Sequence, residues 1–299
     1  MKPTTRDDYR QRIETVLRHV CDHLDEPLRP DDLARIACFS PHHFHRIFRG
    51  MVGESLAGFV RRMRLERAAL RLRGTRDTVL EVALDSGYTA HEPFTRAFKR
   101  AFGESPAAFR DRAPSPFPMT PNGIHFGGAL PPLPYDLPVG DPTMLDVDLR
   151  TLDPFHLAAI RHVGPYTGVG PVFERVVGWA AMRGLLGPDT LTVGIFHDDP
   201  QAVPEKELRS DAGIQVKGDV SPDPEAGVDI VEVPGGEYAV ATLKGSYEQL
   251  PQAYGWLVGQ WLPSSGREAD DRPCFEVYRN SPADTAPEEL LTEIHLPLK

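Results

Sequence analysis

Apolar side chains recur every three or four residues through the first hundred positions, and this spacing predicts helices rather than strands. The first apolar stripe covers residues 13–24 and stops at Pro27 and Pro30, because proline cannot continue a helix. Further helices are expected over residues 31–37, from Pro41 onward, over 56–73, over 79–85 and over 90–101. The N-terminal part is therefore predicted to be an all-α domain.

One pattern of residues occurs twice in this helical part. Residues 44–55 read FHRIFRGMVGES, and residues 94–105 read FTRAFKRAFGES. Each copy follows a short apolar helix and a turn. Ser40 is expected to cap the helix that begins at Pro41, and Gly87 suits a turn with positive φ in the second copy. The repeat predicts two helix-turn-helix units in one domain, an arrangement that reads DNA sequence.

The second helix of each unit carries the side chains expected to reach DNA. Such a helix enters the major groove, where residues near its start contact base edges and Arg also binds phosphate. The predicted DNA-binding residues are His42, His45, Arg46, Arg49, His91, Glu92, Thr95 and Arg96. Arg46 and Arg96 occupy matching places in the two copies. A metal site at His42, His43 and His45 is the alternative, but no acid or cysteine completes it, so no metal is expected.

The C-terminal part is duplicated on a different pattern. Tyr166 and Tyr247 lie 81 positions apart, and each precedes an amphipathic helix, expected over 171–185 and 249–261. A strand that ends in a turn follows each helix. Each repeat then closes with another strand, expected over 212–217 and 291–298. Alternation of side chains, as in Glu276-Val277-Tyr278, is typical of strands. We predict an α+β domain of two β-α-β-β repeats with its helices on one face of a shared sheet.

Charge divides the chain at the same place. Residues 1–114 hold 21 Lys and Arg against 16 Asp and Glu, a net +5, whereas residues 115–299 hold 12 against 27, a net −15. A basic N-terminal half suits double-stranded DNA, and a run of arginines strengthens this interpretation. The run consists of Arg61, Arg62, Arg64, Arg67, Arg71 and Arg73.

Nine prolines lie between Ala113 and Pro142, so no regular element is expected there. The predicted domains are residues 1–112, which are expected to bind DNA, a Pro-rich linker over 113–144, and a second domain over 145–299. The linker is expected to join two independently folded bodies.

Residues 10–112 resemble the AraC family of transcription regulators. The resemblance is carried by IACFSPHHFHRIFRGMVGES, VRRMRLERAALRL and VALDSGYTAHEPFTRAFKRAFGESPAAFR. It implies that one chain inserts two recognition helices into successive major-groove segments on one face of DNA, with RNA polymerase as a further partner. The chain departs from the family at Ala90, where serine is common, and at Pro93, where a base-reading side chain is usual.

Residues 145–299 resemble the GyrI-like, or effector-binding, domain through GIFHDDP, PCFEVYRNSP and EELLTEIHLPLK. Such domains hold amphipathic, often cationic, small molecules. Carboxylates beside aromatic faces suit an apolar cation, with Glu276 as the main countercharge. The predicted ligand-binding residues are Glu276, Tyr278, Glu293, Tyr166, Trp179, Phe196, Tyr247 and Trp256. For the tryptophans, a place in the core is the alternative.

These patterns favour a sequence-specific transcription regulator that is modulated by a cationic, amphipathic small molecule. Two alternatives stay open: a GyrI-like hydrolase of reactive small molecules, and a protein-binding inhibitor whose acidic half mimics nucleic acid. No Ser/His/Asp set or phosphate loop is evident, so we predict a protein that is not an enzyme and has no cofactor. Three scattered cysteines, and the lack of a long apolar stretch or signal peptide, predict a cytoplasmic protein without membrane contact.

Overall fold

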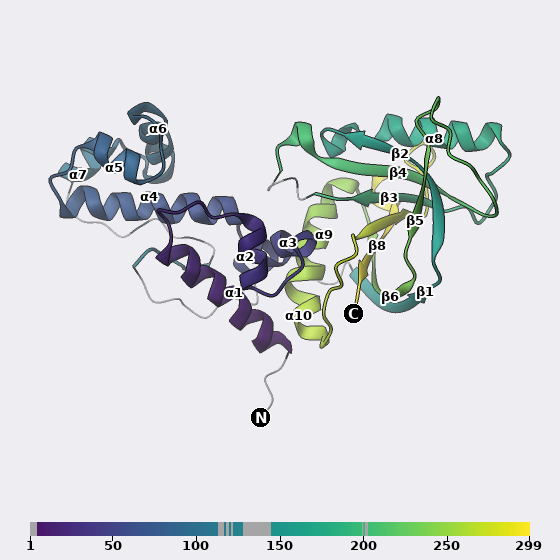
Figure 1. Cartoon of the computed structure of the whole chain (residues 1–299), viewed down its shortest axis with the longest axis horizontal. Helices are drawn as coiled ribbons and strands as arrows, with labels where there is room; N and C mark the ends of the chain where they lie inside the picture. The colour runs from purple at the N-terminus through teal and green to yellow at the C-terminus, as the bar shows by residue number, and fades with distance from the viewer. Residues whose placement is uncertain are drawn as a thin grey trace.

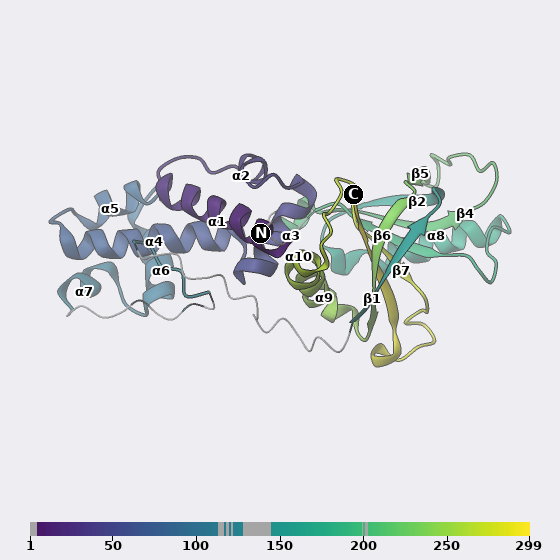
Figure 2. The same ribbon diagram turned by 90° about the horizontal axis from the view of Figure 1, so that it is seen from below.

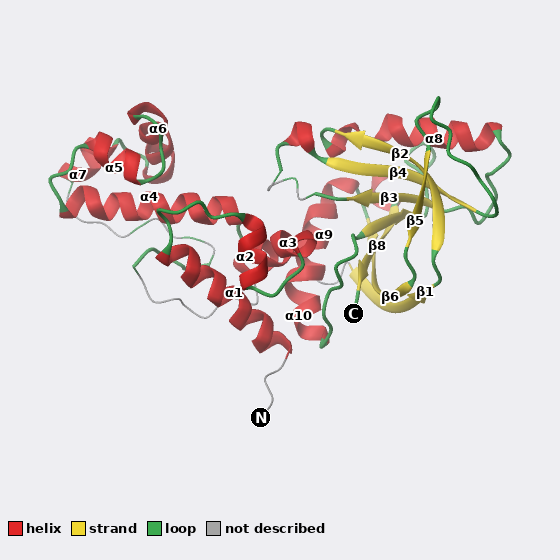
Figure 3. Cartoon of the chain, viewed as in Figure 1, coloured by secondary structure: helices red, strands yellow, loops and turns green. Residues whose placement is uncertain are grey.

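The computed structural model describes residues 5–112, 117, 120, 122–127, 145–198, 200 and 203–299, without the side chain of His42. A helical N-terminal half lies beside a C-terminal half built from one sheet and its helices (Figure 1, Figure 3). The predicted fold class is therefore confirmed.

The N-terminal half consists of two helical groups joined by one long helix. Its helices are α1 (Thr5–Asp22), α2 (Pro30–Ile36), α3 (Pro41–Val52), α4 (Leu56–Gly74), α5 (Val79–Asp85), α6 (His91–Phe102) and α7 (Pro106–Asp111). Helices α1 to α3 pack at the start of α4 around Phe44, Phe48 and Phe59. Helices α5 to α7 pack at its far end around Phe94 and Phe98. Each predicted helix-turn-helix unit thus has its own core, and α4 links them (Figure 1).

Three helices of the N-terminal half, α4, α5 and α7, begin with a side-chain cap. Ser55, Thr78 and Ser105 each accept a hydrogen bond from a backbone N–H of the helix that they precede. Ser40 precedes α3, but its hydroxyl makes no such bond, so the expected cap is absent and only the proline at the helix start is as predicted. Ala90 leaves α6 without a side-chain cap because it has no hydroxyl.

The C-terminal half is organised around one antiparallel sheet of eight strands. The strands are β1 (Leu145–Leu152), β2 (Phe155–Val163), β3 (Thr192–Phe196), β4 (Arg209–Val216), β5 (Asp229–Val233), β6 (Gly236–Lys244), β7 (Phe275–Tyr278) and β8 (Leu291–Pro297). Their order is β1-β6-β8-β7-β3-β4-β2-β5. The two repeats therefore meet at β3 and β7. The outermost strands, β1 and β5, were not predicted, and each pairs with a strand of the other repeat.

Helices cover one face of this sheet. Helix α8 (Gly170–Met182) packs on β2 and β4 through Val176 and Trp179. A continuous helical segment, formed by α9 (Leu250–Trp256), η5 (Leu257–Trp261) and α10 (Leu262–Ser265), packs on β6 and β8. Both helices lie on the same side, as the repeat predicts.

The two halves of the chain are packed against each other rather than separate. One apolar cluster contains Phe44 and Phe48 of the N-terminal half together with Leu257 and Ile294 of the C-terminal half. Figures 1 and 2 show α3 lying beside the helical segment of α9 and η5 at the junction. The two halves are therefore in contact in this structure through α3, and the independent folding of each half stays a prediction.

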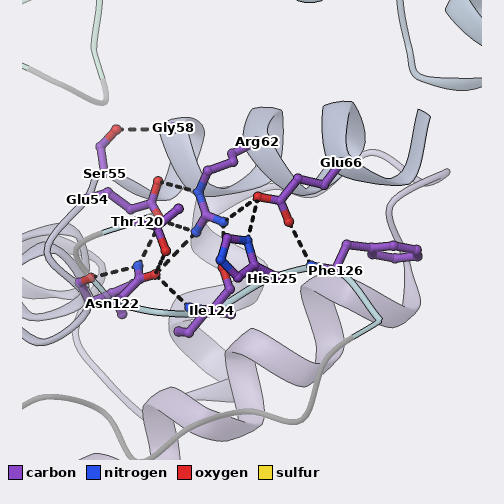
Figure 4. A network of polar contacts seen from close by, with 11 residues as sticks. Glu54, Ser55, Gly58, Arg62, Glu66, Thr120, Asn122, Ile124, His125 and Phe126 are labelled. Carbon is purple, nitrogen blue, oxygen red and sulfur yellow. Dashed lines mark hydrogen bonds and ion pairs between the residues drawn. The ribbon is translucent and has the colours of Figure 1, made fainter. Parts of the chain in front are cut away.

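Part of the predicted linker belongs to the N-terminal half. Residues 122–127 lie along α4 and join a polar network with Glu54, Arg62 and Glu66 (Figure 4). The Asn122 amide donates to the Val52 carbonyl at 2.9 Å, and Glu66 accepts from the Phe126 N–H at 2.8 Å. Most of the residues from 113 to 144 lie outside the described part of the chain, so the proposed domain boundaries stay a prediction.

Candidate DNA-reading and ligand-binding sites

Helix α6 presents a polar face to solvent at the end of the molecule farthest from the sheet (Figure 1). His91, Glu92 and Arg96 are exposed, and the half-buried Thr95 hydroxyl lies 3.5 Å from His91 Nε2. On the opposite side of the helix Phe94 and Phe98 are fully buried. Three of the four residues predicted in this helix are thus exposed, and their contact with DNA stays a prediction.

Helix α3 is placed differently, because its surface is covered by the C-terminal half. The Arg46 guanidinium lies over the Tyr254 ring, 4.5 Å from its centroid. The His43 ring is fully buried, with Nε2 3.0 Å from the Arg272 carbonyl oxygen and Nδ1 3.8 Å from the Cys274 sulfur. In this arrangement the Arg46 guanidinium is engaged with the C-terminal half, and its contact with a DNA base stays a prediction.

The other predicted residues of α3 are only partly available. His45 and Arg49 are half-buried, and the side chain of His42 lies outside the described residues. His45 lines a groove of about 380 Å³ between the two helix-turn-helix units, together with Arg61, Arg64 and Tyr88. This groove lies between α3 and the turn before α6, so it joins the two reading helices.

Most of the arginine run serves the fold rather than DNA. Arg62 binds Glu54 and Glu66, and Arg67 makes a bidentate pair with Asp25. Arg64 donates to the Leu24 carbonyl at 2.9 Å. Arg71 pairs with Asp77 and Asp85, and Arg73 lies over the Phe109 ring. Of the run, only Arg61 is exposed, so charge counting overstated the surface available to phosphate.

The predicted countercharge, Glu276, lies at the centre of the sheet and is only 3% exposed. Tyr278, two residues further along β7, shares its face, and its hydroxyl donates to Glu276 Oε2 at 2.7 Å. Burial raises the pKa of Glu276 to about 7, against the lowering effect of the Tyr278 and Tyr254 hydroxyls and the Arg46 charge. Ionisation of this carboxyl group therefore costs more free energy than it does in water.

Aromatic rings surround this carboxyl group. The Tyr278 ring packs edge-on against Tyr247 and Phe173, with centroids 5.5 Å and 5.3 Å apart. Tyr166 packs against Phe196 with centroids 4.8 Å apart. Tyr254 is 8% exposed, and among the described residues its hydroxyl has no hydrogen bond of ordinary geometry. We call these residues, together with Glu276 and Gly194, the Glu276 cluster.

Gly194 occupies the place opposite Glu276 in the β3–β7 pairing. A Cβ at this position would lie 2.8 Å from the Phe196 ring and 3.0 Å from the Tyr278 hydroxyl. The two positions are also equivalent in the repeats, 82 residues apart, as are Pro200 and Pro282. One repeat thus supplies the carboxylate, and the glycine of the other leaves room for the Phe196 ring and the Tyr278 hydroxyl beside it.

Sequence reasoning missed Tyr254, Phe173 and Gly194. Gly194 was detectable by aligning the two repeats, because glycine stands there where the other repeat has Glu276. Tyr254 and Phe173 lie in the two predicted helices, but only the packing on the sheet shows which helix positions face Glu276.

Three predicted ligand residues are not brought to this cluster. Glu293 pairs with Val277 across β7–β8, so it points to the opposite face, where it binds Arg150 at 3.0 Å and Arg279 at 2.7 Å. Trp179 lies in the core beneath α8 and donates to Asp223. Trp256 packs at the junction of the two halves.

Glu293 has a counterpart in the first repeat. Asp211, 82 positions earlier, points to the same face and binds both His197, at 2.6 Å, and Arg161. Burial alone would raise the pKa of Asp211, but the hydrogen bonds from these two partners hold it below the usual range. Both acids therefore form ion-paired supports of the sheet.

Comparison with known proteins assigns both halves. Residues 33–112 match the helix-turn-helix domain family, and residues 145–299 match the GyrI-like small molecule binding domain. The regulatory protein SoxS of Salmonella typhimurium is 33% identical over 104 residues, which cover 35% of this chain and 97% of that protein. The chain belongs to the AraC family of regulators. It is therefore a DNA-binding transcription regulator with a GyrI-like domain.

Two further comparisons cover parts of this AraC-family chain. The right origin-binding protein of Escherichia coli is 38% identical over 88 residues, covering 29% of this chain and 30% of that protein, so the chain spans less than a third of that relative. The crystal structure of the EcmrR C-terminal domain is 19% identical, with a TM-score of 0.44, and the match covers 52% of this chain and 98% of that one.

Two further features of the AraC-family chain bear on its chemistry. Among the residues that the structure describes, no three His, Cys, Asp or Glu side chains are grouped to hold a metal ion. Within the same residues, every helix is too short or too polar to span a lipid bilayer.

Proposed function

We propose that this AraC-family regulator responds to a cationic, aromatic small molecule bound at the Glu276 cluster of its GyrI-like domain. The observation that carries the proposal is a buried carboxyl group enclosed by aromatic rings. An ionised carboxylate in such a place costs free energy unless a cation accompanies it, and aromatic faces attract the same cation. The Tyr254 hydroxyl, which lacks a hydrogen bond of ordinary geometry among the described residues, adds a polar group that a ligand can satisfy.

Calorimetry tests the ligand directly. Tetraphenylphosphonium is expected to bind the full chain, whereas the neutral triphenylphosphine oxide binds more weakly. Glu276→Gln keeps the shape of the side chain and removes its charge. It should weaken tetraphenylphosphonium by about 1–3 kcal/mol, the usual contribution of a charged partner, and leave the neutral compound unchanged. Equal losses for both compounds, or no binding to the wild type, would contradict the cationic effector.

The other half of the proposal is that α6 reads DNA through Arg96. Arg96→Ala is expected to cost about 1–3 kcal/mol on a duplex of roughly 20 bp selected from a random pool by the full chain. Fluorescence anisotropy at fixed salt measures the change. Arg76→Ala removes the same charge from an exposed position in the turn after α4 and should cost less. Equal effects of the two substitutions would remove Arg96 from the reading surface.

Hydrolysis of a bound molecule is the second candidate function. A carboxyl group whose pKa lies near 7 can exchange a proton with a substrate during a reaction. Product analysis of reactive compounds incubated with the wild type and with Glu276→Gln separates the two: turnover that depends on Glu276 favours the enzyme.

We propose that the regulator acts in the cytoplasm. RNA polymerase, implied by the family, stays a predicted partner.

A further inference from the structure

The first recognition helix is held against the GyrI-like domain by a contact that only glycine permits. Gly50 of α3 and Gly259 of η5 meet backbone to backbone. A Cβ on Gly50 would lie 2.6 Å from the Gly259 Cα, and a Cβ on Gly259 would overlap the Gly50 backbone. Segment η5 is a π-helical turn inside a longer helix, a geometry often found at functional sites. Both glycines have ordinary helical backbones, so the close approach itself accounts for the missing side chains.

The same contact places a cation of the chain beside the proposed effector site. Arg46 lies over the ring of Tyr254, whose hydroxyl faces Glu276. The positive charge of Arg46 acts to lower the pKa values of Glu276, Tyr254 and the Cys274 thiol, against the larger effect of burial. The proposed effector is also a cation that lies on an aromatic face near this buried carboxyl group. Arg46 therefore occupies, from within the protein, the kind of position that we propose for the effector.

Arg46 cannot serve both partners at once. The side of α3 that carries His43, Arg46 and Gly50 is covered by α9 and η5, while α6 stays open to solvent. We expect each of the two reading helices to occupy its own segment of the major groove when DNA is bound. In this structure α6 is open to solvent, whereas the side of α3 that carries Arg46 is covered.

We propose that Arg46 is an internal competitor for the effector site, and that a cationic effector displaces it, releases α3 from α9 and η5, and thereby strengthens DNA binding. The cationic nature of the effector rests on the proposed function, whereas the closed contact between α3 and η5 is independent of it. Because coupling between two binding sites is reciprocal, bound DNA must in turn raise the affinity for the effector by the same factor.

Gly259→Ala in the full chain tests the closed contact without any ligand. The added methyl forces α3 away from η5 and should tighten binding to the selected duplex on the order of tenfold, within the usual range of coupling between sites. Gly178→Ala is the matched control: Gly178 lies in α8 of the same domain, and a Cβ there meets no atom within 4 Å. This control should bind DNA like the wild type.

Tetraphenylphosphonium is the ligand probe in the same assay. At saturation it should tighten DNA binding by the wild type and by Gly178→Ala equally, and change Gly259→Ala by less than about twofold, because that variant is already open. Circular dichroism and thermal unfolding establish that each variant is folded. If Gly259→Ala does not fold, Tyr254→Leu, which removes the ring beneath Arg46, replaces it with the same expectation.

The outcomes separate the two proposals. A folded Gly259→Ala that binds DNA no more tightly than the wild type overturns the internal competitor. The internal competitor is also overturned if calorimetry shows that tetraphenylphosphonium binds, but the compound weakens DNA binding or leaves it unchanged. If tetraphenylphosphonium does not bind at all, the proposed effector class fails, and a tighter Gly259→Ala complex still supports the closed contact.

Discussion

Glu276→Gln is expected to raise the free energy of unfolding by about 3 kcal/mol at pH 8 and to change it little at pH 4.5. Burial raises the pKa of Glu276 from 4.5 to about 7 in the folded protein, and each tenfold change in proton affinity corresponds to about 1.4 kcal/mol. The folded state holds this proton more tightly than the unfolded state. Wild-type stability from this group is therefore complete below pH 4.5 and is lost as the pH rises through 7.

The groups that face Glu276 do not reverse this sign. They are Arg46 from α3, Tyr254 from α9, Tyr247 before α9, Tyr278 from β7 and the nearby Cys274. The pKa values of the three tyrosines and of Cys274 are raised above their usual range by burial first of all, so these groups stay neutral up to pH 8.

Urea unfolding between pH 4.5 and pH 8 measures the effect of Glu276→Gln. Glu248→Gln removes an exposed carboxylate from the same half and serves as the control, with a change below about 0.5 kcal/mol. A gain in stability that is independent of pH would show that Glu276 is ionised at no cost, and would remove the physical basis for a cationic ligand.

Asp211→Asn is expected to lower the free energy of unfolding at pH 7 by about 2–4 kcal/mol. The side chain is 3% exposed and binds both His197 and Arg161, so the substitution removes a buried charge from two partners. Arg161 is 48% exposed and can regain water, which keeps the cost below that of a fully buried pair.

The pH dependence of this second effect has the opposite sign to that of Glu276. The pKa of Asp211 is held below its usual range by hydrogen bonds that outweigh burial. Its stabilisation is present at neutral pH and is lost as the pH falls through the folded-state pKa. The difference between wild type and Asp211→Asn should therefore shrink in acid.

Thermal and urea unfolding measure this difference. Asp148→Asn, whose side chain is 59% exposed and pairs with Arg150, should cost less than about 1 kcal/mol. A cost for Asp211→Asn no greater than that of Asp148→Asn would show that the buried network contributes nothing to stability.

The helical half was largely predictable because its signals are local. The repeated pattern and helical spacing depend on neighbours a few residues apart, so α3, α4 and α6 are placed correctly by sequence alone. The edge strands β1 and β5 were missed. Half of their side chains face solvent, and their partners lie in the other repeat.

The site could be predicted only in part, for a geometric reason. Alternation places Glu276 and Tyr278 on one face of a strand, but the face of Glu293 depends on its register with β7. The meeting of Gly50 with Gly259 joins residues more than two hundred positions apart. Such a contact leaves no local pattern, so the covering of α3 and the place of Arg46 required the folded structure.

The crossed pairing of the outer strands makes the two repeats an intertwined pair. Strand β1 precedes the first repeat yet hydrogen-bonds to β6 of the second, and β5 precedes the second yet hydrogen-bonds to β2 of the first. A cut between β4 and β5 would leave each fragment holding a strand that completes the other. The fragments are expected to reassemble, as two subunits with exchanged arms do, because each alone would leave β2 or β6 without its outer strand.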